Sequence, residues 1–500
     1  MDTKVCRLTG DQRDAYVMEE AGAVIRKGGL VAFPTETVYG LGADARNPDA
    51  SGKIYAAKGR PSDNPLIVHI ADMDALAPIV KTIPKKAYLL AEAFWPGPLT
   101  MIFEKTDQIP FETTGGLSTV AVRMPDHEEA LTLIKAAGGY IAAPSANTSG
   151  RPSPTTAQHV YDDMNGRIDM ILDGGAVGIG VESTIVDLTG DVPLILRPGY
   201  INQKMLEDVI GEVRIDPAIG GILPDGTHPK APGMKYKHYA PKGELFLVAG
   251  ETEQVVLKIN SIVREKEAAG KKTAVIAADE TSGRYQCNII KSIGRREEDE
   301  TIARHLYAIL REFDDMGVEY IYSEEFNTPH MGMAIMNRLL KAAGHKVIYI
   351  KQEEKEMVAI GCDHGGFDLK QIVTAHLKER GIEVKDMGCM DKNSCDYPIF
   401  GRAVAKAVAN GECERGIVIC TTGIGISMVA NKVKGVRCAL CTNGLMAKMT
   451  RLHNDANVLA LGANMVGPGL ATEIVDIFLD TEFSGEEKHC RRIAMLDEEL

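Results

Sequence analysis

The sequence lacks any hydrophobic run long enough to cross a membrane. No apolar stretch reaches the roughly 18 residues of a membrane-spanning helix, and no apolar segment of a signal peptide is recognisable. Low-complexity tracts and repeats with a period of about 20–50 residues are absent as well, which excludes a solenoid or a propeller. These absences predict a soluble cytoplasmic protein.

An excess of positive charge and a disulfide pattern are also missing. The net charge of −13 does not favour tight non-specific binding to a nucleic-acid backbone. Eight of the ten cysteines lie in the last 140 residues at irregular spacing, which favours free thiols over a disulfide framework. Cys438 and Cys441 form a C-x-x-C, but without a second pair or ligand histidines we interpret them as small core residues.

The features that are present indicate several α/β domains. The 500 residues, 45% of them hydrophobic and 25% charged, suffice for about two to four globular domains. Apolar strands alternate with helical stretches over 12–230, and 231–243 has almost no apolar periodicity, which indicates a linker or lid. The alternation resumes over 244–350 and again over 357–500, after the charged joint "KQEEKE". In the last two segments such alternation predicts parallel sheets with helical crossovers, and the expected fold class of the chain is α/β.

A first candidate site is carried by polar residues at separate strand ends of 12–230. "KGRPSDNPLIVHI" (58–70) clusters two cations with glycine and proline turns, and it either surrounds a polyanion or is a solvated basic loop. Further arginines occur in "VAVRMPDH" and "ILRPGYI", and hydroxyls occur in "APSANTSGRPSP" and "GVESTIVDL". Together these groups suit a pocket for a nucleoside triphosphate and a small polar substrate.

The ordered motifs of this region resemble a known family. "FPTETVYGLG", "KGRPSDNPL", "FWPGPLT", "PSANTSG" and "VESTIVDL" resemble the YrdC-type threonylcarbamoyl-AMP synthases, and "APGMKYKHYAPK" with the following α/β segment resembles their long, two-domain form. The resemblance implies a YrdC-like twisted α/β domain, then an accessory Rossmann-like domain over 244–350. It implies condensation of L-threonine, bicarbonate and ATP, accompanied by Mg²⁺, to threonylcarbamoyl-AMP with release of pyrophosphate. The product would pass to the tRNA threonylcarbamoyl transferase machinery. The alternative reading of this domain is an RNA-binding module.

The same resemblance implies roles for individual residues. The residues implied to hold threonine are Thr37, His69, Arg123, Ala143 and Ser183. The residues implied to hold ATP are Lys58, Arg60, Asn64, Thr119, Ser145, Asn147, Ser153, Arg197 and Tyr236. Tyr236 would fold over the nucleotide as a lid, and no metal ligands are implied.

A second candidate site surrounds "VICTTGIGIS" (418–427), where an apolar run meets a glycine-rich turn. The turn is neither a Walker A loop nor a dinucleotide G-x-G-x-x-G, although its N–H groups could cradle an anion. Asp363 and His364 also follow an apolar strand, and His453 and Asn454 stand next to another. Because residues at the carboxyl ends of parallel strands meet in one crevice, we expect these groups and Cys420 to form one site.

"GCDHGGFDLK", "DYPIF", "CTTGIGISMVANKVKGVR" and "RLHNDANVLALG" resemble ribose-5-phosphate isomerase B across 357–500. The resemblance implies a Rossmann-like three-layer parallel-sheet domain, no cofactor and a homodimer formed through this domain. It makes Cys420 the catalytic base for ribose 5-phosphate/ribulose 5-phosphate isomerisation and His453 the residue that opens the sugar ring. The sugar phosphate would be held by Asp363, His364, Thr421, Thr422, Gly423, Ile424, Gly425, Asn454, Lys488 and Arg492.

Three positions depart from the pattern of that family. Thr421 stands where the loop prefers glycine, and Asn464 and Lys488 stand where arginines are usual. Because lysine cannot replace the bidentate fork of arginine, phosphate recognition is expected to be weaker. The sugar phosphate is therefore open, and a non-catalytic sugar-phosphate sensor or dimerisation module is the alternative to an isomerase.

Overall fold

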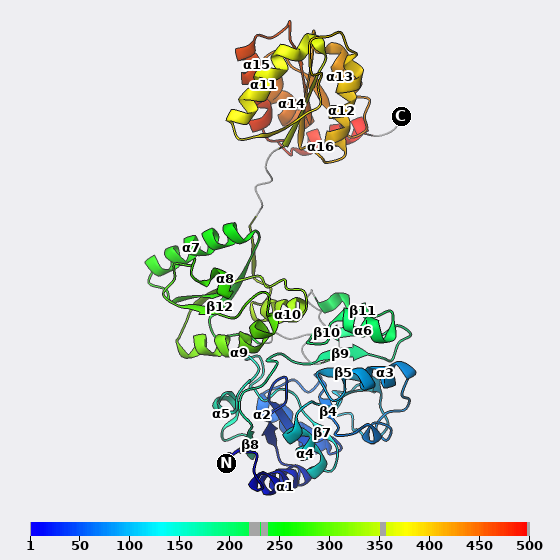
Figure 1. Ribbon diagram of the computed structural model, residues 1–500, viewed down its shortest axis with the longest axis vertical. Coiled ribbons are helices and arrows are strands. Elements are labelled where there is room, and N and C mark those ends of the chain that lie inside the picture. Colours follow the sequence, from blue (N-terminus) through cyan, green and yellow to red (C-terminus); the bar gives the residue numbers. More distant parts are fainter. Residues whose placement is uncertain (1, 220–230, 232–238, 351–356, 498–500) are drawn as a thin grey trace. The chain divides into compact units, whose positions relative to one another are not determined.

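The computed structural model describes residues 2–219, 231, 239–350 and 357–497. The chain divides into two compact units, residues 1–350 and 351–500 (Figure 1). Within the described residues, no helix is both long and apolar enough to span a membrane. The predicted lid residue Tyr236 and the charged joint 351–356 lie outside the described residues.

The first unit begins with a mixed sheet of eleven strands. In spatial order its strands are β1 (Lys4–Arg7), β8 (Met170–Asp173), β2 (Val31–Phe33), β3 (Gly40–Asp44), β7 (Ile141–Ala142), β4 (Ile67–His69), β6 (Thr119–Arg123), β5 (Leu99–Glu104), β9 (Thr184–Asp187), β10 (Leu194–Arg197) and β11 (Arg214–Ile215). Its helices are α1 (Arg13–Arg26), α2 (Pro48–Lys58), α3 (Lys85–Phe94), α4 (Glu128–Ala136), α5 (Ala157–Met164) and α6 (Gln203–Ile210), with 3₁₀ turns at Met73–Ala75 and Pro217–Ile219. The sheet mixes parallel and antiparallel pairs.

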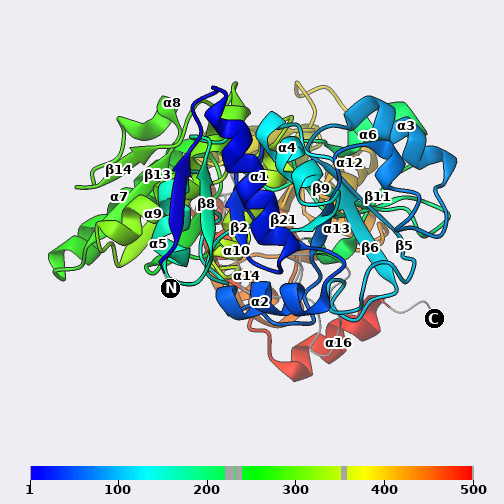
Figure 2. The same cartoon turned by 90° about the horizontal axis from the view of Figure 1, so that it is seen from below.

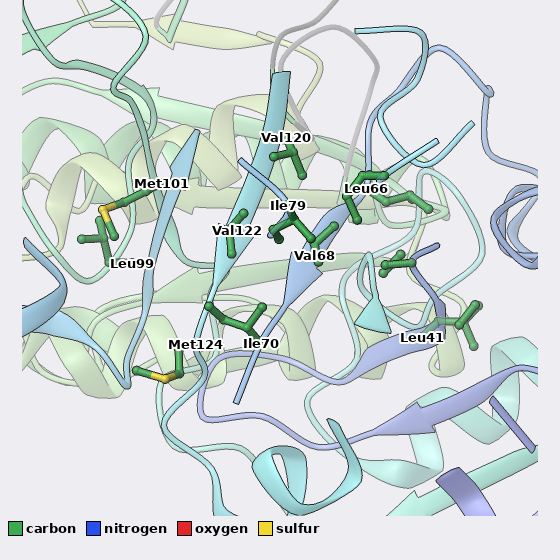
Figure 3. Close-up of a cluster of buried hydrophobic side chains, with 14 of the residues drawn as sticks. Leu41, Leu66, Val68, Ile70, Ile79, Leu99, Met101, Val120, Val122 and Met124 are labelled. Carbon is green, nitrogen blue, oxygen red and sulfur yellow. The ribbon is translucent and has the colours of Figure 1, made fainter. Parts of the chain in front are cut away.

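Because side chains alternate along strands β4 and β6, the polar last residue of each strand lies on the same face of the sheet. Val68 of β4 and Val122 of β6 pack into the main core of this sheet. Figure 3 shows both valines among other side chains of that core. Since successive side chains of a strand point to opposite faces, His69 and Arg123 lie on the face opposite those valines. The two strands are parallel and pair His69 with Arg123, so both polar side chains end their strands side by side.

Two local features hold the helices around this sheet. Gly22 of α1 lies so close to Ala136 of α4 that a Cβ would not fit, which lets the two helices pack tightly (Figure 2). Helix α2 is capped at its start by the side chain of Asn47 and ends at Gly59, whose φ of 63° is left-handed. Because the chain turns at Gly59, Arg60 leaves the helix axis and enters the site described below.

The remainder of the first unit is a separate five-stranded parallel sheet. Its strands, in spatial order, are β14 (Ile290–Ser292), β13 (Thr273–Ala277), β15 (Tyr320–Glu324), β12 (Glu244–Ala249) and β16 (Val347–Tyr349). Its helices are α7 (Thr252–Ala268), α8 (Asp279–Ser282), α9 (Asp299–Asp315) and α10 (Gly332–Ala342). Helices α9 and α10 cover one face, and their core also takes in Val38 and Val181 from the first sheet's loops.

The second unit is a three-layer α/β structure on a parallel sheet. Its strands, in spatial order, are β18 (Glu383–Asp386), β17 (Met357–Cys362), β19 (Arg415–Cys420), β21 (Val458–Gly462) and β20 (Cys438–Leu440). Its helices are α11 (Phe367–Glu379), α12 (Tyr397–Ala409), α13 (Ile424–Ala430), α14 (Gly444–Asn454), α15 (Pro468–Asp480) and α16 (Glu487–Asp497), with a 3₁₀ turn at His364–Gly366. One core packs α11, α14 and α15 on one face, and another packs α12 and α13 on the other (Figure 1). The α/β class predicted from the sequence is therefore correct.

Candidate active sites

A pocket in the first unit brings together most of the residues expected there. Those that line it are Thr37, Arg60, His69, Arg123, Ala143, Ser145, Asn147, Ser183 and Arg197. Further lining residues, for which the sequence suggested no role, are Thr35, Val38, Gly40, Ile67, Pro144, Glu182 and Tyr239. Lys58, Asn64, Thr119 and Ser153 were also expected in this site but do not line the pocket.

Arg123 is anchored in the pocket by several partners. It is buried, and its guanidinium pairs with the Glu36 carboxylate at 2.6 Å. It also donates to Oγ1 of Thr37 at 2.9 Å and to the carbonyl of Gly97 at 3.2 Å. A planar fork held in this way is preorganised to receive a carboxylate.

His69, beside Arg123, is a neutral imidazole. Burial, reinforced by the Arg123 charge, lowers the pKa of His69 from its ordinary 6.5 to about 3. Its Nδ1 lies 3.2 Å from the carbonyl of Ile67, which can only accept, so Nδ1 carries the proton. In this tautomer Nε2 is the ring nitrogen that carries a lone pair.

This buried neutral histidine predicts a pH-dependent stability. Because the folded pKa lies below 6.5, the stabilisation is complete above that pH and is lost as the pH falls toward 3. Between pH 7 and 5 the unfolding free energy of the first unit should fall by about 2 kcal/mol through His69 alone. Urea unfolding at both pH values should show a smaller difference for His69→Gln than for the unsubstituted protein. An equal difference in the two proteins would contradict the assignment.

The two cations of the 58–70 turn have different roles. Lys58 lies behind the pocket, where its buried ammonium donates to the carbonyls of Ser145 and Asn147 and so joins two loops. Arg60 lines the pocket and donates to the carbonyls of Asn64 and Pro65, at 3.3 and 3.1 Å. Burial lowers the pKa of Arg60 to about 10, so its charge persists at neutral pH.

Ser183 and Arg197 form a further wall of the pocket. Arg197 ends β10 and donates to the carbonyl of Ser183 at 3.0 Å and to its Oγ at 3.1 Å. The Ser183 hydroxyl also lies 2.7 Å from that of Thr100. A serine so placed by an arginine can contact a substrate while the guanidinium faces an anion.

Glu182 and Tyr239 are two of the lining residues that sequence reasoning missed. Glu182 directly precedes Ser183 in "VESTIV", and its adjacency to that residue is the signal that could have revealed it. Tyr239 belongs to "KYKHYAPK", in which we singled out Tyr236 instead. The Tyr239 ring is buried and stacks on Tyr307, with ring centroids 5.2 Å apart.

In the second unit, Cys420 ends β19 beside a glycine-rich turn, as the sequence suggested. The thiol is buried, and the N–H of Gly423 donates to its Sγ at 3.1 Å. Gly423 has a φ of 78°, which glycine adopts without strain, and α13 starts directly after it. A Cβ at position 365 would clash with the Thr421 hydroxyl, so Gly365 leaves room for the threonine side chain. Asp363 and His364 follow β17 at the same edge, since Cys362 pairs with Ile419.

The expectation that His453 and Asn454 share this crevice within one chain is wrong. Both residues end α14, just before β21 begins at Val458. Strand β21 is parallel to β19 and pairs Gly462 with Cys420, so its start lies at the amino edge of the sheet. His453 precedes its strand in the sequence, so the rule that groups residues at carboxyl ends does not apply to it.

The C-terminal helix α16 lies with His453 rather than with Cys420. The His489 ring of α16 stacks on that of His453, with centroids 4.3 Å apart. Lys488 pairs with Glu486 at 2.7 Å. Lys488, which the resemblance implies to bind phosphate, is therefore already paired with a neighbouring carboxylate.

The cysteines are free thiols, as expected from their spacing. Burial raises the pKa of Cys438 to about 12 and that of Cys441 to about 11. Among the described residues, no group of three histidines, cysteines or carboxylates could hold a metal ion.

Comparisons with known proteins agree with this division. The chain matches the family model described as "Telomere recombination" over residues 23–199 and "Threonylcarbamoyl-AMP synthase, C-terminal domain" over 201–344. It matches "Ribose/Galactose Isomerase" over 358–496.

Individual relatives support both halves. The Bacillus subtilis threonylcarbamoyl-AMP synthase is 50% identical over 330 residues, which is 66% of this chain and 93% of the relative. The crystal structure of Pyrococcus abyssi Sua5 complexed with L-threonine covers 70% of this chain and 100% of that one, at 46% identity and a TM-score of 0.65. The Escherichia coli ribose-5-phosphate isomerase B is 48% identical over 136 residues, which is 27% of this chain and 91% of the relative.

Fold and pocket thus define an α/β enzyme of the nucleotidyltransferase class joined to a sugar-isomerase-like domain. More particularly, the chain belongs to the threonylcarbamoyl-AMP synthase family, and its C-terminal part belongs to the ribose-5-phosphate isomerase B family.

Proposed function

We propose that the pocket of the first unit binds L-threonine between Arg123 and His69 and holds ATP on the side of Arg60 and Arg197. The observation that supports this most is the pairing of the Arg123 guanidinium with a neutral imidazole at adjacent strand ends. Arg123 would take the amino-acid carboxylate, and Nε2 of His69 would accept a hydrogen bond from the ammonium or hydroxyl group. Two further cations then remain for phosphate groups.

The reaction requires positioning and charge stabilisation rather than a covalent enzyme intermediate. The amine of threonine bonds to the carbon of bicarbonate with loss of water and gives a carbamate. An oxygen of the carbamate then forms a bond to the α-phosphorus of ATP while the bond to the pyrophosphate oxygen breaks. Arg60 and Arg197 would stabilise the charge on the phosphate oxygens. Mg²⁺ would arrive with ATP and neutralise part of the phosphate charge.

An assay of the purified chain tests this proposal. Pyrophosphate release should require threonine, bicarbonate and ATP together, and its product should support threonylcarbamoyl transfer to tRNA by the tRNA threonylcarbamoyl transferase machinery. Release without threonine would instead indicate an ATP pyrophosphatase. Binding of RNA without any pyrophosphate release would favour the RNA-binding alternative.

We further propose that the second unit isomerises an aldose phosphate to a ketose phosphate, with Cys420 as the base. Support comes from the buried thiol beside the N–H groups of the 421–425 turn, which could stabilise an enediolate. Ribose 5-phosphate is the first substrate to test. Because Lys488 is paired with Glu486, we expect it to bind phosphate weakly. The KM for ribose 5-phosphate should therefore be high.

A homodimer through this unit would complete the isomerase site. Cys420 and His453 lie at opposite edges of one sheet, so a second copy is needed to supply the ring-opening imidazole. The helices that flank the edge strand β20 carry exposed apolar side chains, with Met428 of α13 exposed by 62% and Leu445 of α14 by 66%. Apolar side chains exposed in this way are typical of a subunit interface.

Leu445→Glu should therefore separate the two activities. A buried charge at the interface should shift the chain from dimer to monomer and lower isomerase activity at least about tenfold. Pyrophosphate release should remain unchanged, because the synthase pocket lies in the other unit. Light scattering reports the mass, and Gln371→Glu, at an exposed position of helix α11, controls for the same one-unit change of charge. A dimeric Leu445→Glu protein would contradict this interface.

A further inference from the structure

A buried carboxylate connects the synthase pocket to the 244–350 domain. Glu182 lines the pocket and accepts a hydrogen bond from Oγ of Ser153 at 2.5 Å. On its other side Nε of Arg338, on α10, donates to it at 3.0 Å. The hydroxyl of Tyr307, on α9, lies 2.9 and 3.1 Å from its two oxygens. Arg338 and Tyr307 are both completely buried.

Arg338 also contacts the second wall of the pocket. Its Nη1 donates to the carbonyl of Pro198 at 2.6 Å. Pro198 directly follows Arg197, and Glu182 directly precedes Ser183. One guanidinium from the 244–350 domain therefore holds the immediate neighbours of both residues that form this wall.

We propose that Arg338 and Tyr307 are positioning residues for the ATP-binding half of the pocket, and that they act through Glu182. The inference rests on the proposed assignment of Arg197 to ATP. The 244–350 domain then contributes to the site, because it sets the spacing of Ser183 and Arg197. Reciprocally, ATP that binds this wall should strengthen the docking of that domain.

Several charged and titratable groups face Glu182, and they keep it ionised. They are Arg338 and Lys341 of α10, Tyr307 of α9, Arg197 of β10 and Tyr239. Burial raises the pKa of Glu182, but the charges of Arg338 and Arg197 and the Ser153 hydroxyl outweigh it and lower the pKa to about 2. Without Arg338, burial would favour the neutral acid, and the remaining ionised fraction would repel a triphosphate.

Kinetics of the full chain test the proposal. Arg338→Met should raise the KM for ATP at least about tenfold and raise the KM for threonine less, because of the residues expected to hold threonine only Ser183 adjoins Glu182. Tyr307→Phe, which keeps the ring stacked on Tyr239, should raise the KM for ATP about threefold or more. Arg338→Lys should restore part of the loss, since it retains the charge.

Arg311→Met is the matched control for a weakened domain contact. Arg311 is buried on α9 and joins the same two domains through Asp163, at 2.9 Å, and the carbonyl of Pro152, at 2.6 Å. It contacts no residue that lines the pocket in these bonds. Its replacement should lower the melting temperature without a selective increase of the KM for ATP. If Arg338→Met and Arg311→Met affect all kinetic constants alike, the positioning role is overturned.

Two further readouts do not depend on overall stability. The KM for ATP of Arg338→Met should fall as the pH is lowered from 8 to about 6, because protonation removes the Glu182 charge, whereas the unsubstituted protein should not show this effect. Adding Glu182→Gln to Arg338→Met should likewise restore ATP binding. A pH-independent KM for ATP in Arg338→Met, together with no rescue by Glu182→Gln, overturns the proposal. If Arg338→Met does not fold, the KM for ATP of Tyr307→Phe decides instead. An unsubstituted chain that releases no pyrophosphate overturns the proposed function itself.

Discussion

Cys420→Ser should lower aldose–ketose interconversion by about a thousandfold, within the range that a positioned general base contributes. A serine hydroxyl is far less acidic than a thiol and cannot supply a comparable base at neutral pH. The Gly423 N–H that donates to Sγ would stay in place, so the turn should keep its conformation. The substitution removes no large apolar volume, and the second unit should still fold.

Solvent deuterium incorporation at the carbon beside the carbonyl of the sugar phosphate measures this step directly. The unsubstituted protein should incorporate deuterium, and Cys420→Ser should not. Cys413→Ser is the matched control, since that thiol is also buried in the second unit but lies outside the turn. Equal incorporation by both serine variants contradicts a thiolate base. No incorporation by any of the proteins would favour the sugar-phosphate sensor.

Arg123→Ala should lower kcat/KM for threonine by about a thousandfold, or ~4 kcal/mol, because it removes the charged partner proposed for the threonine carboxylate. The loss includes a second effect, since the Glu36 carboxylate that Arg123 now neutralises would repel that of threonine. Adding Glu36→Gln should therefore recover part of the activity. The KM for ATP should change much less.

Steady-state pyrophosphate release at varied threonine and at varied ATP separates these effects. Arg46→Ala is the control, because this arginine of the same unit stacks on Tyr140 and does not line the pocket. Arg123→Lys should be intermediate, as it keeps a charge without the fork. Arg123 would belong to the nucleotide instead if its replacement raised the KM for ATP and spared that for threonine.

The candidate sites were predictable where a motif keeps its chemistry within a few residues. "PSANTSG" and "VESTIVDL" place Ser145, Asn147 and Ser183 at strand ends, and all three line the pocket. Lys58 shows the limit of this reasoning. The charge pattern around Lys58 suggested an anion site, but its Nζ donates hydrogen bonds to two backbone carbonyls instead. These carbonyls approach Lys58 only in the folded chain. Nothing in the local sequence distinguishes it from Arg60.

By itself, the sequence determined the α/β class, the free thiols and the identity of the residues at strand ends, because these depend on local periodicity and spacing. The tertiary structure alone decided which strand ends face the same way. Reversed strands mix parallel and antiparallel pairs in the first sheet, and His453 lies at the start of β21 rather than beyond its end. Contacts such as that of Glu182 with Arg338 join positions 156 residues apart, and no local pattern encodes them. They arise because a buried charge must find its partner wherever the fold brings one.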